Sequence, residues 1–324
     1  MTTTPIAPFR LAPFFSERVW GRPNLRPWYA DTGTDALVGE AWLTGPTSLI
    51  ETGPLAGRTL ASVVQEFPGD LLNPATTASQ ATPEFPLLIK LLFPNDKLSV
   101  QVHPDDAQAQ AIGQPRGKTE CWYVLEAKPG ATVALGMKPG VTPQALADSA
   151  ADNTMESLIE QLPVAPGDMI YVDAGTVHAI EPGVVLLETQ QTSDTTYRLY
   201  DYGRPRELHL AQGLAVIRTR TDAGKVAPVV HNGFTRLIEK KYFTVDRFDL
   251  AAQASISLRN TAGVSGCIVP LSGSGRVTTP AGSADLDLDL ILGKAIILPA
   301  RCPAIQVEAT TPLAFVHCFE PATV

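Results

Sequence analysis

The chain has 324 residues, of which 44% are hydrophobic and 18% charged, a balance typical of a globular protein with a large buried core. Its net charge of −8 argues against a general nucleic-acid or anionic-membrane partner, because such surfaces are bound through dense basic patches. An anionic small molecule remains compatible with this charge if a few Lys or Arg side chains gather in one pocket.

The cysteines and the N-terminus favour a cytoplasmic protein without a membrane span. The four cysteines are scattered, which indicates neither a zinc knuckle nor a disulfide framework; they are Cys121, Cys267, Cys302 and Cys318. The N-terminus has no basic start followed by an apolar run, and no apolar stretch approaches 18 residues. The 28 prolines and 25 glycines alternate with short apolar runs, so we expect a mainly β fold rich in turns.

The first predicted elements are a helix and a buried strand. Residues 59–72 carry apolar side chains at helical spacing and include Pro68-Gly69, which predicts a short helix ending there. An apolar strand then begins at Leu87, and Lys90 interrupts it. A lysine directed into a core requires a partner of opposite charge or an anionic ligand.

Residues 98–106, LSVQVHPDD, predict a strand with one apolar and one chemically active face. Alternation places the apolar side chains on one face and Gln101 and His103 on the other. An amide and an imidazole two positions apart can reach one point, and imidazole suits divalent transition metals. Taken alone, the stretch is more typical of a strand with a hydrogen-bonded core histidine.

Further polar residues fall at predicted strand ends. Glu120 opens the next strand, with Lys118 two positions earlier on the same side, although a glutamate there is usually solvated. Residues 142–162 predict a helical excursion, after which His178 follows a glycine-containing turn. Gln101, His103, Glu120 and His178 together form a nitrogen and oxygen donor set suited to zinc or a related divalent ion.

The strand from Val184 has an unusually polar continuation. Glu188 and Asp194 share one parity, and continued alternation would place Arg198 on the same side. Residues 207–217 predict a helix in which His209 is structural, and residues 219–233 predict a linker. Short strands at sandwich or barrel spacing follow. We therefore predict a catalytic domain over residues 1–220 and a metal-free β domain over residues 221–324.

The donor spacing is that of a cupin, and one branch of that superfamily matches closely. Gly167, Gly175 and His178 match the second cupin motif, with Asp173 in place of its usual proline and Gln101 in place of the usual first-motif histidine. The chain resembles the short bacterial form of type I mannose-6-phosphate isomerase. The matching segments are SERVWG, GEAWL, LIKLLFPNDKLSVQVHPDD, GKTECWYVL, GTVHAI and SDTTYRLYDYGR.

The resemblance implies two cupin-like β-barrels of jelly-roll type, with a few helices packed around the first. It also implies zinc bound by Gln101, His103, Glu120 and His178, and Arg198 as the catalytic arginine. The resemblance also implies Lys118, Glu188 and Asp194 as proton-transfer candidates, and His103 stays open as a further one. Lys90, Arg198 and Arg204 are candidates for the phosphate of a sugar-phosphate substrate.

The implied reaction is aldose–ketose isomerisation of mannose 6-phosphate and fructose 6-phosphate through a cis-enediol. Alternatives are a glucose-6-phosphate isomerase, an iron-dependent oxygenase using His103, Glu120 and His178, or a sugar-phosphate-binding cupin without catalysis. The glutamine ligand and the polar run 188–198 favour the isomerase. The sequence leaves open zinc against another divalent metal, the proton carrier, and a monomer against a homodimer.

Overall fold

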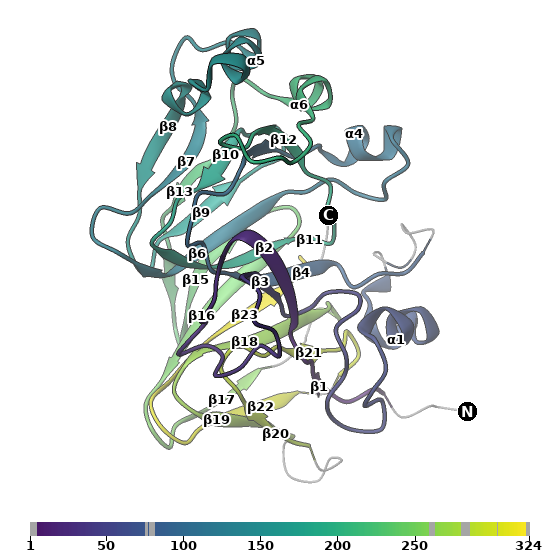
Figure 1. Cartoon of the computed structure of the whole chain (residues 1–324). Coiled ribbons are helices and arrows are strands. Elements are labelled where there is room, and N and C mark those ends of the chain that lie inside the picture. The colour runs from purple at the N-terminus through teal and green to yellow at the C-terminus, as the bar shows by residue number, and fades with distance from the viewer. Residues whose placement is uncertain are drawn as a thin grey trace.

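The computed structural model describes residues 5–74, 77, 82–258, 263–279, 286–302 and 304–321. Within these ranges most regular structure is β, and the strands form four sheets, named I to IV here in the order in which they stack (Figure 1). In sheet I the strand order is β12 (Tyr197–Tyr200), β5 (Val100–Val102), β10 (His178–Ile180), β7 (Thr132–Met137) and β8 (Ile159–Pro163). In sheet II the order is β13 (Gly224–Val226), β9 (Met169–Val172), β6 (Glu120–Ala127), β11 (Val184–Gln191), β4 (Leu87–Leu92), β3 (Val38–Trp42) and β2 (Phe14–Arg22).

The remaining strands form the other two sheets. Sheet III has the order β1 (Phe9–Arg10), β21 (Ile296–Leu298), β18 (Gly266–Ser272), β23 (Leu313–Phe319), β16 (Thr244–Leu250), β15 (Phe234–Glu239) and β14 (Val229–His231). Sheet IV has the order β17 (Ser255–Leu258), β22 (Ile305–Ala309), β19 (Gly275–Thr278) and β20 (Asp287–Leu290). All the strand pairs in the four sheets are antiparallel.

The helices are short and lie at the margins of the sheets. They are α1 (Leu60–Glu66), α2 (Pro68–Leu71), α4 (Asp106–Ala111), α5 (Pro143–Asp152), the 3-10 helix η1 (Met155–Leu158) and α6 (Leu210–Val216). Thr59 caps α1 by accepting a hydrogen bond from the Ser62 amide, which is why this helix begins where the sequence places it. None of the helices in the described ranges has the length and apolar character that a membrane crossing requires.

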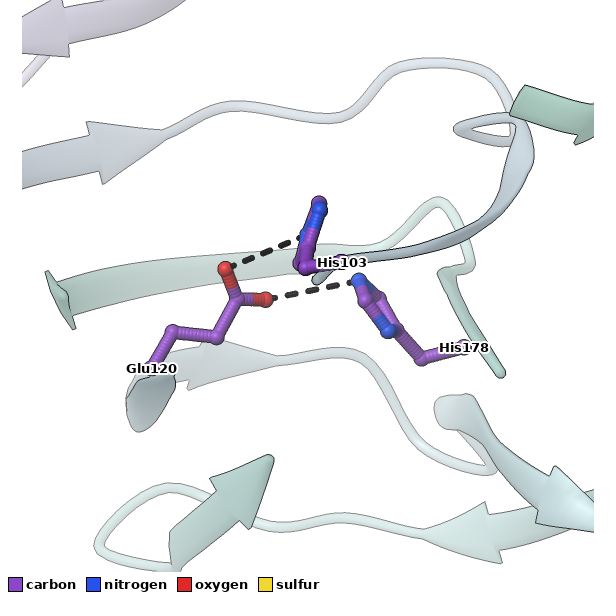
Figure 2. Close-up of side chains that lie close together, drawn as sticks. All are labelled: His103, Glu120 and His178. Carbon is purple, nitrogen blue, oxygen red and sulfur yellow. Dashed lines mark ion pairs between the residues drawn. The ribbon is translucent and has the colours of Figure 1, made fainter. Parts of the chain in front are cut away.

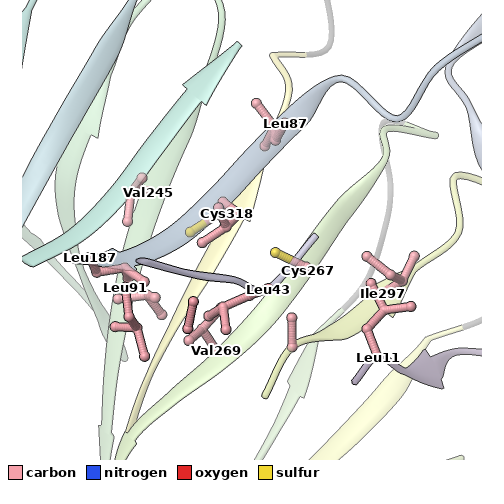
Figure 3. Packing of buried hydrophobic residues seen from close by; sticks show 14 of the residues in the cluster. Leu11, Leu43, Leu87, Leu91, Leu187, Val245, Cys267, Val269, Ile297 and Cys318 are labelled. Atoms are coloured by element: carbon pink, nitrogen blue, oxygen red, sulfur yellow. The ribbon is translucent and has the colours of Figure 1, made fainter. Parts of the chain in front are cut away.

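Apolar clusters between the layers hold the stack together. Sheet II is buried on both faces, because Leu186 joins the cluster against sheet I while its neighbour Leu187 joins the cluster against sheet III. Figure 3 shows the second of these clusters, where Leu91 and Leu187 of sheet II face Val245 of sheet III. A third cluster fills the space between sheets III and IV, and a fourth lies between sheet I and helices α5 and α6. Two-sided burial explains the nearly continuous apolar runs of β4 and β11.

The prediction of a mainly β chain with few helices is confirmed. Hydrogen bonding closes none of the four sheets into a barrel within the described ranges. Two strands pair across the predicted boundary at residue 220, since β1 pairs with β21 and β13 pairs with β9.

Three local predictions are wrong in part. The end of the excursion predicted for residues 142–162 is strand β8, which pairs with β7. The linker predicted for residues 219–233 contains the short strands β13 and β14. The helix predicted from residue 207 begins only at Leu210, and Leu208 is exposed.

Gly21 marks a close approach within the β2–β3 pair, and replacing it tests this packing. A Cβ atom at Gly21 would lie 2.4 Å from the backbone carbonyl carbon of Val38, so Gly21→Ala should lower the free energy of unfolding by about 1–3 kcal/mol. Urea unfolding would measure the change. Gly69→Ala is the control, because nothing lies within 4 Å of its added Cβ. An unchanged unfolding midpoint for Gly21→Ala would contradict this packing.

Candidate metal centre

Three buried side chains from two facing sheets converge on one point. His103 directly follows β5 and His178 opens β10, both in sheet I, whereas Glu120 opens β6 in sheet II. Their potential ligand atoms all lie within 4.8 Å of one another, and each residue is at most 1% exposed. Figure 2 shows both rings directed towards the Glu120 carboxylate. This is the arrangement predicted for these three residues from strand ends.

Backbone carbonyls orient the two imidazole rings. His103 Nδ1 donates to the Thr195 carbonyl at 3.1 Å, and His178 Nδ1 donates to the Thr176 carbonyl at 2.9 Å. A proton on Nδ1 leaves Nε2 unprotonated in both rings, which is the form that ligates a metal. These Nε2 atoms lie 3.5 and 3.4 Å from the two oxygens of Glu120.

The donor atoms fit a divalent metal ion. His103 Nε2 and both Glu120 carboxylate oxygens are buried without a hydrogen-bond partner, an arrangement of acceptors that a shared cation would stabilise. The two distances from an imidazole Nε2 to a carboxylate oxygen, 3.5 and 3.4 Å, match the roughly 3.4 Å expected between neighbouring ligands of a tetrahedral ion with bonds of about 2.1 Å. The Gln101 amide nitrogen lies 3.2 Å from His178 Nε2, and the two residues pair across β5 and β10, so the side-chain amide, whose oxygen is a potential ligand, lies beside the same point.

Burial keeps these donors uncharged when no cation is bound. It raises the pKa of Glu120 to about 8, with a further contribution from the nearby Glu188 carboxylate. Burial likewise lowers the pKa of His178 to about 3 and that of His103 well below its usual range. A cation at this point would reverse the effect on Glu120, because an opposite charge favours the ionised carboxylate.

A row of charged side chains extends from Glu120 across sheet II. Five adjacent strands contribute one ionisable side chain each, in the order Glu120, Glu188, Lys90, Glu40 and Arg18. Lys90 Nζ lies 3.3 Å from Glu188 and 3.9 Å from Glu40, and Arg18 makes two hydrogen bonds to Glu40 at 2.9 and 3.2 Å. Burial by itself would lower the pKa of Lys90, but the two carboxylates raise it above its ordinary value. The predicted need of Lys90 for a partner is therefore met within the protein.

Two tryptophans complete this row. The Trp122 indole N–H donates to Glu188 at 3.1 Å, and the Trp42 indole N–H donates to Glu40 at 2.6 Å. The Lys90 ammonium lies 5.0 Å from the centre of the Trp42 ring. These contacts give both carboxylates the hydrogen-bond partners that a buried polar group requires.

Lys118 and Asp194 occupy different positions relative to the metal point. Lys118 is buried, and its ammonium lies 3.7 Å from Glu120 Oε2. Asp194 is exposed in the segment between β11 and β12, where it lines a hollow of about 230 Å³ together with Trp42 and Leu88. Lys118 thus belongs to the buried cluster, and Asp194 lies at the protein surface.

Arg198 lies in sheet I and not beside Glu188, so the side predicted for it by continued alternation is wrong. Strand β11 ends at Gln191, and the chain crosses to sheet I before β12 begins. There Arg198 pairs with Gln101, which pairs in turn with His178, so that the three residues form a row across β12, β5 and β10. Arg198 Nη1 donates to the Glu207 carbonyl at 2.7 Å, and its Nε is buried without a partner.

Arg204 is engaged by neighbouring groups outside the buried cluster. Its guanidinium lies 3.0 Å from the Asp201 carboxylate, donates to the Lys97 carbonyl at 2.7 Å, and lies 3.7 Å from Asp96. None of these three partners belongs to the His103–Glu120–His178 cluster.

The sequence alone did not identify several residues of the site. Arg18, Glu40, Trp42 and Trp122 were not proposed as site residues, although each contacts a member of the charged row. The available signal was Lys90, because a lysine within an apolar strand calls for acidic partners. Which acids fill that role depends on strand order, which a local pattern does not contain.

Replacing Glu40 tests the buried row through its pH dependence. Burial would raise the pKa of Glu40, but Lys90 and Arg18 lower it to about 2. A folded-state value below the unfolded one stabilises the protein at neutral pH, and this stabilisation is lost as the pH falls from about 4.5 towards 2. Glu40→Gln should therefore lower the free energy of unfolding by about 3 kcal/mol at pH 7 and by less than half of that near pH 3.

Urea unfolding at the two pH values measures this difference. Glu160→Gln provides the control, since Glu160 is exposed on β8 and its replacement should change stability by less than about 0.5 kcal/mol. An equal loss for Glu40→Gln at both pH values would contradict the assignment of an ionised, paired Glu40.

Known proteins resemble this chain over nearly its whole length. A family model described as "Phosphomannose isomerase type I, catalytic domain" matches residues 9–141. The Bacillus subtilis protein "Probable mannose-6-phosphate isomerase GmuF" is 33% identical over 325 residues, which cover 96% of this chain and 99% of that protein. The mannose-6-phosphate isomerase of Streptococcus mutans is 34% identical over 275 residues, which cover 81% and 84% of the two chains.

A solved structure gives the same result. The crystal structure of the Bacillus subtilis mannose 6-phosphate isomerase superposes with a TM-score of 0.80 at 29% identity, covering 97% of this chain and 99% of that one. The family resemblance predicted from the sequence is thus confirmed. The chain belongs to the type I mannose-6-phosphate isomerase family.

Proposed function

We propose that this protein interconverts mannose 6-phosphate and fructose 6-phosphate with a divalent metal bound by Gln101, His103, Glu120 and His178. The observation that carries the proposal is the convergence of buried, unpartnered His103 and Glu120 atoms with Arg198 in line with two of the ligands. Family membership supports the same reaction, since the relatives carry its name. We propose zinc as the metal, because the donor set of imidazole, carboxylate and amide suits it.

The reaction moves a proton between C1 and C2 of the sugar through a cis-enediol, so it needs a base, an acid and stabilisation of negative charge on oxygen. When bound, the metal supplies Lewis-acid stabilisation of that charge. In the proposed mechanism Arg198 adds a fixed positive charge through its unpartnered Nε, which is preorganised because its Nη1 is already held by the Glu207 carbonyl.

We propose Glu188 and Lys118 as the groups that move the proton. Both are buried beside the cluster. Trp122 and Lys90 hold the Glu188 carboxylate in a fixed position, from which it can accept a proton. Asp194 is proposed to act from the rim of the site, where it is exposed. His103 is better suited to ligation than to proton transfer, because its Nε2 faces the metal point.

Lys90 and Arg204 remain our proposals for substrate contacts, with different support. The charge of Lys90 is balanced by two carboxylates, which favours a hydrogen bond to a sugar hydroxyl over phosphate binding. Arg204 would have to exchange contacts with Asp201 or Lys97 to bind a phosphate.

The architecture supports a further proposal about domains. We infer that sheets I and II, apart from β13, form a jelly roll of cupin type within residues 1–220, and that sheets III and IV, apart from β1, form a second one within residues 221–324. The candidate metal cluster among the described residues lies between sheets I and II, which suits a structural role for the second unit. Four free, buried cysteines suit a cytoplasmic location, because thiols stay reduced there.

A coupled assay of mannose 6-phosphate conversion tests the function directly. The protein should be active as purified, lose activity after chelation, and regain it when zinc is added. Parallel reconstitution with cobalt, manganese and ferrous iron would rank the metals. Absence of activity with every metal would overturn the proposal, and glucose 6-phosphate isomerisation and iron-dependent oxygen consumption would then be the functions to assay.

A further inference from the structure

Both outward-facing backbone groups of Arg198 are bound by a single residue, His209. Strand β12 is an edge of sheet I, so its outer side has no neighbouring strand. There the Arg198 N–H donates to His209 Nδ1 at 3.3 Å, and the Arg198 carbonyl accepts from the His209 N–H at 2.7 Å. The imidazole nitrogen thus takes the place of the carbonyl that a further strand would provide.

The segment that carries His209 is itself held in place. The Gly213 N–H donates to the His209 carbonyl at 2.8 Å, which joins the segment to α6. Helix α6 packs closely on β12, because a Cβ atom at Gly213 would lie only 2.3 Å from Leu199. The Glu207 carbonyl, two residues before His209, accepts the hydrogen bond from the Arg198 guanidinium. One short segment therefore fixes both the backbone and the head group of the arginine.

This attachment bears on the reacting centre because of where Arg198 lies. Arg198, Gln101 and His178 form a row across three paired strands, and Arg198 occupies its edge. An edge strand has a neighbouring strand on one side only, so the position of Arg198 is the least constrained of the three unless something holds its outer side.

We propose that His209 is a positioning residue that holds Arg198 in the geometry required for charge stabilisation. The inference rests on the proposed isomerase function, because it assigns a task to the arginine of that reaction. The ring acts through Nδ1 as a neutral hydrogen-bond acceptor, and its Nε2 faces the Glu207 carboxylate at 4.0 Å, which favours the proton on Nε2. The sequence pattern had indicated only a structural histidine within a helix.

Three substitutions separate acceptor position from side-chain bulk. In His209→Asn the amide oxygen can occupy the place of Nδ1, whereas in His209→Gln the longer chain carries it towards the place of Nε2. His209→Leu removes the acceptor and keeps a side chain of moderate volume. His231→Leu is a matched control on strand β14, where the histidine ring stacks on Phe234 and contacts no residue of the site.

The steady-state kcat and KM for mannose 6-phosphate would be measured for each variant, together with bound zinc and the thermal unfolding midpoint. We expect His209→Leu and His209→Gln to lower kcat roughly 10- to 100-fold with KM changed less than about twofold. His209→Asn should recover most of the rate, and zinc content should match the wild type in all variants. His231→Leu should leave both constants unchanged.

A double variant tests whether the effect passes through Arg198. In an Arg198→Ala background, His209→Leu should cause no further loss of kcat, because the group it positions is already gone. A full additional loss there, an unchanged kcat in His209→Leu, or equal impairment of Asn and Gln variants would overturn the inference. If His209→Leu does not fold, the comparison of Asn with Gln decides in the same way.

The proposed function is tested separately by the wild-type assay. A wild type that is inactive with every metal would overturn the proposed function itself. An active wild type whose His209 variants keep the same kcat would overturn only the inference about His209.

Discussion

The pairing of buried charges is the constraint on which this structure depends. Lys90 is only 2% exposed, and an ammonium ion so placed is tolerated only when carboxylates surround it. Glu188 and Glu40 provide them from the strands on either side, and Arg18 balances Glu40 from the next strand. From β11 to β2, the order of strands in sheet II is therefore also an order of alternating charge. A strand displaced from this order would leave at least one charge buried and unpaired, which is far more costly than the loss of an apolar contact.

The sequence could predict which residues act together when they lie on one strand. Gln101 and His103 share a face by alternation, and so do Lys118 and Glu120 at the start of the next strand, so their convergence required only that these two parts of sheets I and II face each other. Arg198 shows the limit of this reasoning. Its parity relative to Glu188 has no meaning once the chain leaves sheet II for sheet I, and no local pattern marks that crossing.

The same reasoning does not predict partners from distant parts of the chain. The link between Glu40 and Lys90 depends on β3 lying beside β4, and their side chains give no sign of it in the sequence. The fold shows the same division between local and distant information. Helix α1 was predictable from Thr59 and its apolar spacing, whereas the three-residue strand β13 exists because the distant strand β9 pairs with it.

The crossing between β11 and β12 relates metal binding to the stability of the contact between sheets I and II. Residues 192–196 join sheet II to sheet I, and within them the Thr195 carbonyl orients the His103 ring. Gln190 anchors the start of this crossing by donating to the Ser193 carbonyl at 2.6 Å. A cation bound between His103 and Glu120 would link sheets I and II through side chains, whereas residues 192–196 link them through the backbone. Because a ligand that binds only the folded state stabilises that state, a bound metal would stabilise the contact between sheets I and II. Within the described ranges no cluster of potential metal ligands lies between sheets III and IV, where apolar side chains fill the space, so the contact between these two sheets is independent of metal supply.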